Sequence, residues 1–227
     1  MTVKAIVFDL DGTIIKFNLD YKTLRAELIR YLTSRGFPRS LFSLRESVFE
    51  MIKKVEVYMR NNGMPKEKIK EIKRSLFSII DRYELEAAHG ASLISGVIPT
   101  LESLKKRSIK LAVFTINGKK ATEHILKHFQ LSHFFDAVVP RELTPSVKPD
   151  PSHLKTVLSI LGVKAEETIV VGDGEIDMAC AKMVNAIPVG LVSDRVSPEK
   201  LISAGASHLL SSFTDLLPLI DEFSKEV

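Results

Sequence analysis

Residues 5–13 read Ala-Ile-Val-Phe-Asp-Leu-Asp-Gly-Thr and place two acidic side chains directly after a short apolar run. The run Ala5–Phe8 is typical of a strand in a parallel sheet that helices cover on both faces. Asp9 and Asp11 therefore follow the carboxyl end of this strand, where open α/β sheets bind their ligands. Residues two apart in an extended chain point the same way, so both carboxylates face one site, and Gly12 then lets the chain turn.

Two carboxylates this close repel each other. At about 4 Å the repulsion is roughly 4 kcal/mol at an effective dielectric constant of ~20. A bound cation, or a proton on one of the two groups, offsets it. The stretch also resembles the start of a calcium-binding loop. Such a loop requires Gly at position 14 and Glu at position 20, where this chain has Ile14 and Asp20. We therefore interpret Asp9 and Asp11 as an active-site pair rather than a calcium loop or a plain turn.

The same pattern of short apolar runs recurs along the chain. Runs rich in Val and Ile predict further strands at Lys110–Phe114, Ala137–Val139, Thr168–Val171 and Ile187–Val192. Helical patterns separate these runs from Pro99 onward. This alternation predicts an α/β fold with a doubly wound, Rossmann-like parallel sheet.

A different pattern interrupts the α/β domain after its first strand. Between Lys16 and Gly90, apolar residues recur every three or four positions, which predicts consecutive amphipathic helices. The three stripes are Leu24, Leu28 and Leu32; Leu41, Leu44, Val48, Ile52, Val55 and Met59; and Ile69, Ile72, Leu76, Ile80 and Tyr83. We expect a core domain of residues 1–15 and 91–227, with an all-helical domain inserted at residues 16–90.

Composition limits the classes of protein that this chain can be. Of 227 residues, 45% are hydrophobic and 26% charged, which is typical of a globular protein. Cys180 is the single cysteine, which excludes a disulfide framework and favours a cytoplasmic setting. No apolar run reaches the ~20 residues that span a membrane. The helical insert has 16 basic against 10 acidic residues, but they are dispersed, so we expect no nucleic-acid or membrane partner.

A second acidic motif, Gly172-Asp173-Gly174-Glu175-Ile176-Asp177, follows the predicted strand Thr168–Val171. Its glycines half-match the dinucleotide-binding fingerprint, but Asp173 and Asp177 would repel a pyrophosphate, which needs bare N–H groups. Carboxylates suit a hard cation such as Mg²⁺, which commonly binds one or two carboxylates, several waters and a substrate phosphate. The motif therefore predicts a magnesium site.

Two more polar residues also lie at the end of a predicted strand or in a loop between a strand and a helix. Thr115 ends the predicted strand Lys110–Phe114, and Lys148 lies in a loop before a predicted helix. Each is uninformative alone, because a Thr at a strand end usually caps a turn. With the aspartates they supply a hydroxyl, an ammonium and carboxylates at the ends of successive strands, which predicts a phosphate site with its metal ion.

In this order, DxDGT at 9–13, Thr115, Lys148-Pro149 and GDxxxD at 172–177 resemble the haloacid dehalogenase superfamily, in the branch similar to phosphoglycolate phosphatases. The resemblance implies that the helical insert is a small helical cap of the C1 type. It implies that Asp9 is the nucleophile, which forms an aspartyl-phosphate, and that Asp11 is the general acid and base. The other implied roles are Mg²⁺ binding by Asp9, the Asp11 carbonyl, Asp173 and Asp177, and phosphoryl binding by Thr115 and Lys148.

The activity that this resemblance implies is Mg²⁺-dependent hydrolysis of a small phosphate monoester, phosphoglycolate-like or a sugar phosphate. A sugar phosphomutase similar to β-phosphoglucomutase would share the core motifs and stays open. A non-enzymatic phospho-acceptor similar to receiver domains also stays open, although it has no use for Asp11. We expect a small-molecule partner and a monomer or homodimer. Charge and position make four cap residues candidates for substrate contact: Tyr21, Lys22, Arg25 and Arg45.

Three positions depart from the pattern of that family. Ile116 follows Thr115 where many relatives carry Asn, and Asn117 comes one place later. Gly174 stands where Ser is frequent, and Asn185 replaces a Gly. Asn185 is benign because Asn tolerates the left-handed conformation that ends a helix. The other departures touch the site.

Overall fold

The computed structural model describes residues 2–225 of the chain. It divides into two compact units, Met1–Phe17 with Gly90–Val227, and Asn18–His89. The inserted unit begins two residues later and ends one residue earlier than the expected range of 16–90. Among residues 2–225, no helix has both the length and the apolar character needed to cross a membrane.

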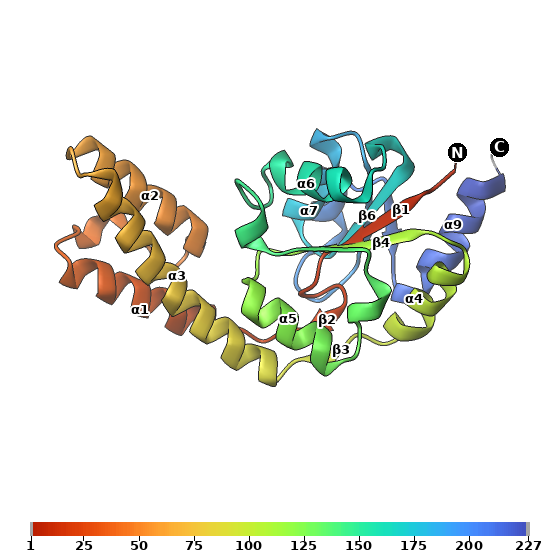
Figure 1. Ribbon diagram of the computed structural model, residues 1–227, viewed down its shortest axis with the longest axis horizontal. Coiled ribbons are helices and arrows are strands. Elements are labelled where there is room, and N and C mark those ends of the chain that lie inside the picture. Colours follow the sequence, from red (N-terminus) through yellow and green to blue (C-terminus); the bar gives the residue numbers. More distant parts are fainter. Residues whose placement is uncertain (1, 226–227) are drawn as a thin grey trace. The chain divides into compact units, whose positions relative to one another are not determined.

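The first unit is built on a parallel sheet, which confirms the predicted fold class (Figure 1). Among the described residues it has six strands in the order β5-β4-β1-β6-β7-β8. Their bounds are β1 Ala5–Phe8, β4 Lys110–Phe114, β5 Ala137–Val139, β6 Thr168–Gly172, β7 Ile187–Leu191 and β8 His208–Leu210. The sequence prediction missed β8, which is a three-residue strand with a single buried side chain, Leu210.

Helices cover both faces of this sheet, with α6 and α7 on one face and α4 and α5 on the other (Figure 1). Val7 and Phe114 belong to a buried cluster with Leu154 of α6 and Cys180 of α7. On the opposite face Phe8 stacks on Phe213, with 5.4 Å between the ring centroids. The helices of this unit are α4 Val97–Lys106, α5 Lys119–His128, α6 Pro151–Leu161, α7 Glu175–Met183, α8 Pro198–Ala204 and α9 Leu216–Lys225.

Short elements complete the first unit. A second sheet pairs β2 (Ile15–Lys16) antiparallel with β3 (Ser92–Leu93), close to where the chain leaves and re-enters this unit. Asn185, two residues after α7, has a φ of +62°, the left-handed conformation expected of it. The 3₁₀ helices of this unit are η2 Ser132–Phe134, η3 Arg141–Leu143, η4 Ala165–Glu167 and η5 Phe213–Asp215.

The second unit is all-helical, with α1 Tyr21–Ser34, η1 Arg39–Leu41, α2 Val48–Asn61 and α3 Lys66–His89. The apolar stripes of its three long helices meet in one buried cluster. The expectation that Leu41 and Leu44 extend the α2 stripe was wrong. A capping box between Ser47 and Glu50 starts α2 at Val48, so Leu41 falls in η1 and Leu44 is exposed.

Candidate active site

The sheet register brings the predicted site residues together. Phe8 at the end of β1 pairs with Val113 of β4 and with Val171 of β6. The residues that follow these strands therefore meet at one edge of the sheet. A cavity of about 180 Å³ lies there, smaller than the roughly 300–1,000 Å³ of pockets for drug-sized ligands. Among the residues that line it are Asp9, Asp11, Thr115, Lys148, Asp173 and Asp177.

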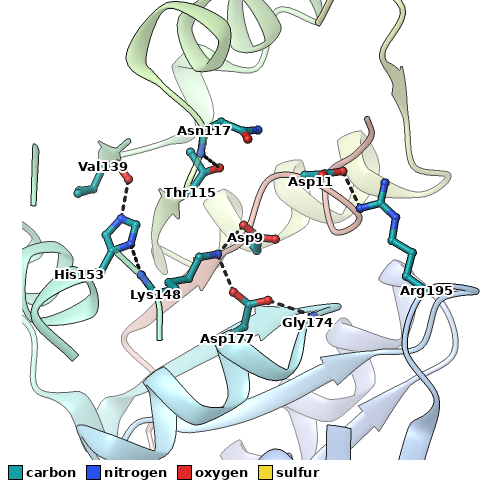
Figure 2. A network of polar contacts seen from close by, with 10 residues as sticks. All are labelled: Asp9, Asp11, Thr115, Asn117, Val139, Lys148, His153, Gly174, Asp177 and Arg195. Atoms are coloured by element: carbon teal, nitrogen blue, oxygen red, sulfur yellow. Dashed lines mark hydrogen bonds and ion pairs between the residues drawn. The ribbon is translucent and has the colours of Figure 1, made fainter. Parts of the chain in front are cut away.

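Lys148 connects two of the acidic residues. Its Nζ donates to Oδ1 of Asp9 and to Oδ1 of Asp177, at 2.6 Å in both cases (Figure 2). Burial lowers the pKa of Lys148, but the charges of Asp177 and Asp9 outweigh that effect and raise it. The ammonium therefore stays charged although its side chain is only 1% exposed.

Asp9, Asp173 and Asp177 form an acidic cluster in which one carboxylate oxygen from each lies within 4.8 Å of the others. Burial is the main cause that raises the pKa of Asp173 to about 6, and the charge of Asp9 adds to it. Burial also raises the pKa of Asp177. Crowded, buried carboxylates gain from a cation, and an all-oxygen donor set fits Mg²⁺. The side chain of Asp11 lies outside this cluster, so its predicted contribution to metal binding is limited to the backbone carbonyl.

Two glycines leave room for the acidic side chains. A Cβ on Gly172 would lie 2.4 Å from Oδ2 of Asp177, and one on Gly12 would lie 2.1 Å from Oδ2 of Asp173. The N–H of Gly174 donates to Oδ2 of Asp177 over 3.1 Å, so the same carboxylate caps α7 (Figure 2). The Gly at position 174, noted above as a departure, therefore helps to orient Asp177 through its backbone.

Asp11 has a partner that the sequence analysis missed. Nη1 of Arg195 donates to Oδ1 of Asp11 over 2.8 Å, and its Nη2 donates to the carbonyl of Phe17 over 2.9 Å. Burial raises the pKa of Asp11 to about 7, although the charge of Arg195 works against that shift. No motif marks Arg195, but its position in the loop after β7 is a signal, because the other site residues also follow strands.

The same loop supports the metal cluster. Oγ of Ser193 donates to Oδ2 of Asp173 over 3.3 Å and accepts the backbone N–H of Arg195 over 3.2 Å. The loop after β7 therefore contacts Asp173 through Ser193 and Asp11 through Arg195. The sequence analysis assigned no role to Ser193.

Hydrogen bonds from neighbouring residues position Thr115 and Lys148. The backbone N–H of Asn117 donates to Oγ1 of Thr115 over 3.1 Å. Nδ1 of His153 accepts the backbone N–H of Lys148 over 3.3 Å, and Nε2 lies 3.0 Å from the carbonyl of Val139 (Figure 2). Burial lowers the pKa of His153 to about 4, and the Val139 carbonyl only partly offsets this. A neutral His153 with its proton on Nε2 satisfies both contacts.

The four cap candidates lie in the second unit. Tyr21 begins α1, and the guanidinium of Arg25 lies 5.4 Å from the centroid of its ring. Nη1 of Arg25 also donates to the carbonyl of Leu44 over 3.2 Å, next to Arg45. Lys22 and Arg45 are exposed. Their contact with substrate stays a prediction.

Comparison with known proteins identifies the family. The profile described as Haloacid dehalogenase-like hydrolase matches residues 6–190. The chain belongs to this family. This haloacid dehalogenase-like hydrolase is 27% identical over 224 residues to the pyrophosphatase PpaX of Listeria innocua, with 96% of each chain covered. The resemblance read from the motifs, to hydrolases of the phosphatase branch, is thereby confirmed.

Solved structures of other proteins share the fold of this hydrolase. A hydrolase from Pseudomonas syringae has a TM-score of 0.68 and 25% identity, covering 96% of this chain and 98% of that one. A predicted phosphoglycolate phosphatase from Haemophilus somnus has a TM-score of 0.63 and 21% identity, covering 96% and 97%. The expectation that the chain is a phosphatase enzyme is confirmed by its family and its relatives.

Proposed function

We propose that this enzyme is a Mg²⁺-dependent phosphatase that transfers the phosphoryl group of a small substrate to Asp9 and then to water. The observation that carries the proposal is the buried ammonium of Lys148, held 2.6 Å from Asp9 in a cavity lined by acidic residues. A carboxylate nucleophile needs no base at neutral pH, but it repels a phosphate dianion. Positive charge beside Asp9 is what this chemistry requires.

Each residue then has a defined task. Asp9 attacks phosphorus, while Lys148 and Thr115 bind the phosphoryl oxygens. Asp11 donates a proton to the leaving oxygen and afterwards takes one from the attacking water, and a pKa of about 7 suits both tasks. Asp9, the Asp11 carbonyl and Asp173 would hold Mg²⁺, with Asp177 behind them. The ion supplies charge that offsets the repulsion between Asp9 and the phosphate.

For the substrate, we propose a small phosphate compound such as pyrophosphate or phosphoglycolate. The cavity beside Asp9 is small, at about 180 Å³. The relative from Listeria innocua is named a pyrophosphatase, and the Haemophilus somnus protein a predicted phosphoglycolate phosphatase. Both names describe cleavage of a phosphoryl group from a small, negatively charged leaving group.

A panel of phosphate compounds tests the proposal. The panel includes pyrophosphate, 2-phosphoglycolate and sugar phosphates, assayed with Mg²⁺ and with a chelator. We expect phosphate release into solution that the chelator abolishes. Phosphate returned to a sugar substrate would instead indicate a phosphomutase. A phosphorylated Asp9 that persists for hours without turnover would indicate a phospho-acceptor, and either result would overturn the proposal.

A further inference from the structure

Of the described residues that line the cavity, two carry positive charge, and they differ in their surroundings. Lys148 is 1% exposed at its side chain and lies between Asp9 and Asp177. Arg195 is 42% exposed at its side chain and lies beside Asp11. Lys148 is therefore buried beside the proposed nucleophile, whereas Arg195 is partly exposed beside the proposed general acid.

Arg195 is also fixed in place. Its Nη1 contacts Asp11 at 2.8 Å and its Nη2 contacts the carbonyl of Phe17 at 2.9 Å. Its backbone N–H is bound by Ser193. A guanidinium keeps its charge at any working pH and matches the planar geometry of carboxylate and phosphate. The cavity therefore presents a permanent, positioned cation next to Asp11.

The position of Asp11 defines what Arg195 can reach. As the proposed general acid, Asp11 marks the side from which the leaving group departs. An oxygen hydrogen-bonded to Oδ1 of Asp11 would lie within about 6 Å of Nη1 of Arg195, because Arg195 contacts that same Oδ1 at 2.8 Å. An anionic leaving group here would otherwise face the carboxylates of Asp11 and Asp9. Arg195 is the lining residue that offsets this repulsion.

We propose that Arg195 is a specificity-determining residue that selects substrates whose leaving group carries its own negative charge, a second phosphate or a carboxylate. The inference rests on the proposed function, since that function gives Asp11 its place beside the leaving group. A neutral alcohol leaving group gains nothing comparable from the guanidinium, so selectivity between the two kinds of substrate measures the effect.

Matched substrates isolate the charge of the leaving group. The first pair is 2-phosphoglycolate and 2-hydroxyethyl phosphate, which differ by a carboxylate against a hydroxymethyl group; the second pair is pyrophosphate and methyl phosphate. We expect Arg195→Met to lower kcat/KM for the anionic member roughly 10- to 100-fold more than for the neutral member, as for loss of a hydrogen bond to a charged group. Arg195→Lys should recover part of the selectivity.

The control is Arg107→Met. Arg107 also pairs with a carboxylate, Asp221, at 2.6 Å, but it does not line the cavity. We expect it to leave kcat/KM unchanged for both substrates. An equal loss on both members of a pair with Arg195→Met would overturn the proposal, because it would show that Arg195 acts only by positioning Asp11.

A binding measurement separates this inference from the proposed function. Calorimetry with Mg²⁺ in an Asp9→Asn background compares the affinities for 2-phosphoglycolate and 2-hydroxyethyl phosphate, with and without Arg195→Met. A selective loss for 2-phosphoglycolate supports the role of Arg195 even if the wild-type protein turns over neither compound. Unchanged relative affinity would overturn it even if the wild-type protein proves to be a phosphatase.

Discussion

The carboxylate of Asp173 occupies the space that a side chain on Gly12 would fill. A Cβ on Gly12 would lie 2.1 Å from Oδ2 of Asp173, and the φ of Gly12 is +87°. Both the close approach and the left-handed backbone require glycine. The turn after β1 therefore admits the metal-site carboxylate of a different strand only because position 12 has no side chain.

Replacing this glycine should damage the metal site more than the fold. Gly12→Ala displaces Asp173, and we expect Mg²⁺ affinity to fall roughly 10- to 100-fold, as when a supporting contact of a metal ligand is lost. The free energy of unfolding should fall by about 2–4 kcal/mol, from backbone strain together with overpacking. Titrating activity with Mg²⁺ and denaturant unfolding measure the two effects.

Gly36→Ala is the matched control. Gly36 has a φ of +88°, but nothing lies within 4 Å of a Cβ placed there. It should lose only about 1–2 kcal/mol of stability, from the left-handed backbone, and keep its Mg²⁺ affinity. If the two variants respond alike to Mg²⁺, Gly12 acts only through the backbone.

Asp9→Asn should abolish turnover and leave the fold intact. An amide cannot form the acyl phosphate, so we expect kcat to fall at least about 1,000-fold. The fold should persist because Lys148 keeps its 2.6 Å contact with Asp177. Phosphate release and thermal unfolding test both statements. Retention of more than a few per cent of wild-type activity would remove Asp9 from the role of nucleophile.

Lys148→Met should destabilise the metal-free protein. The buried carboxylates of Asp9 and Asp177 would lose the cation that they share, and breaking a buried pair costs about 3–5 kcal/mol. Added Mg²⁺ should recover part of the loss by binding the folded state. Inhibition by phosphate or tungstate should weaken as well, and unchanged inhibition would count against phosphoryl binding by Lys148.

Lys105→Met provides the comparison for Lys148→Met. Lys105 pairs with Asp136 at 3.0 Å on the surface, where both side chains are more than a third exposed. Such pairs contribute about 0–1 kcal/mol. If Lys105→Met lowers the free energy of unfolding as much as Lys148→Met does, burial of the ion pairs of Lys148 does not explain their contribution to stability.

His153 should make stability depend on pH. The pKa of His153 is lowered from 6.5 to about 4, so the unfolded chain binds a proton in this range that the folded protein does not. The contribution of His153 to the free energy of unfolding is therefore fully present above about pH 6.5 and is lost as the pH falls toward 4. We expect wild type to lose about 3 kcal/mol more than His153→Gln over that range.

Denaturant unfolding at pH 7, 5.5 and 4 measures this difference. Wild type and variant have the same carboxyl groups, among them Asp11 and Asp173 with raised pKa values, so the comparison isolates the change at His153. His128→Gln, which changes an exposed histidine, is the matched control in the same measurement. Parallel curves for wild type and His153→Gln would contradict a buried, neutral His153.

Local patterns were sufficient for most of the fold. The apolar runs predicted β1, β4 and β5 with their observed bounds, because strands covered on both faces need continuous apolar sequence. The prediction failed where local pattern and actual structure compete. Leu41 and Leu44 continue the helical spacing of α2 toward the N-terminus, but the capping box at Ser47 begins that helix only at Val48.

The candidate site divides along similar lines. Each of the predicted site residues could be named because it lies after a strand or at the start of a helix in a recognisable motif: Asp9, Asp11, Thr115, Lys148, Asp173 and Asp177. Arg195, Ser193 and His153 could not. Their contacts join residues far apart in the chain or depend on burial, and no motif marks them. The one local signal is that Ser193 and Arg195 follow the strand β7.

By itself, the sequence of this protein determined the chemical groups and the edge of the sheet to which they belong, because an apolar strand and the residue types that follow it are local properties. The tertiary structure alone decided how those charges are shared: Lys148 between Asp9 and Asp177, and Arg195 on Asp11. The physical reason is that hydrogen bonds and charge interactions depend on distance and burial in space. Asp11 and Arg195 are 184 positions apart in the sequence, so they come within hydrogen-bonding distance only when the chain folds.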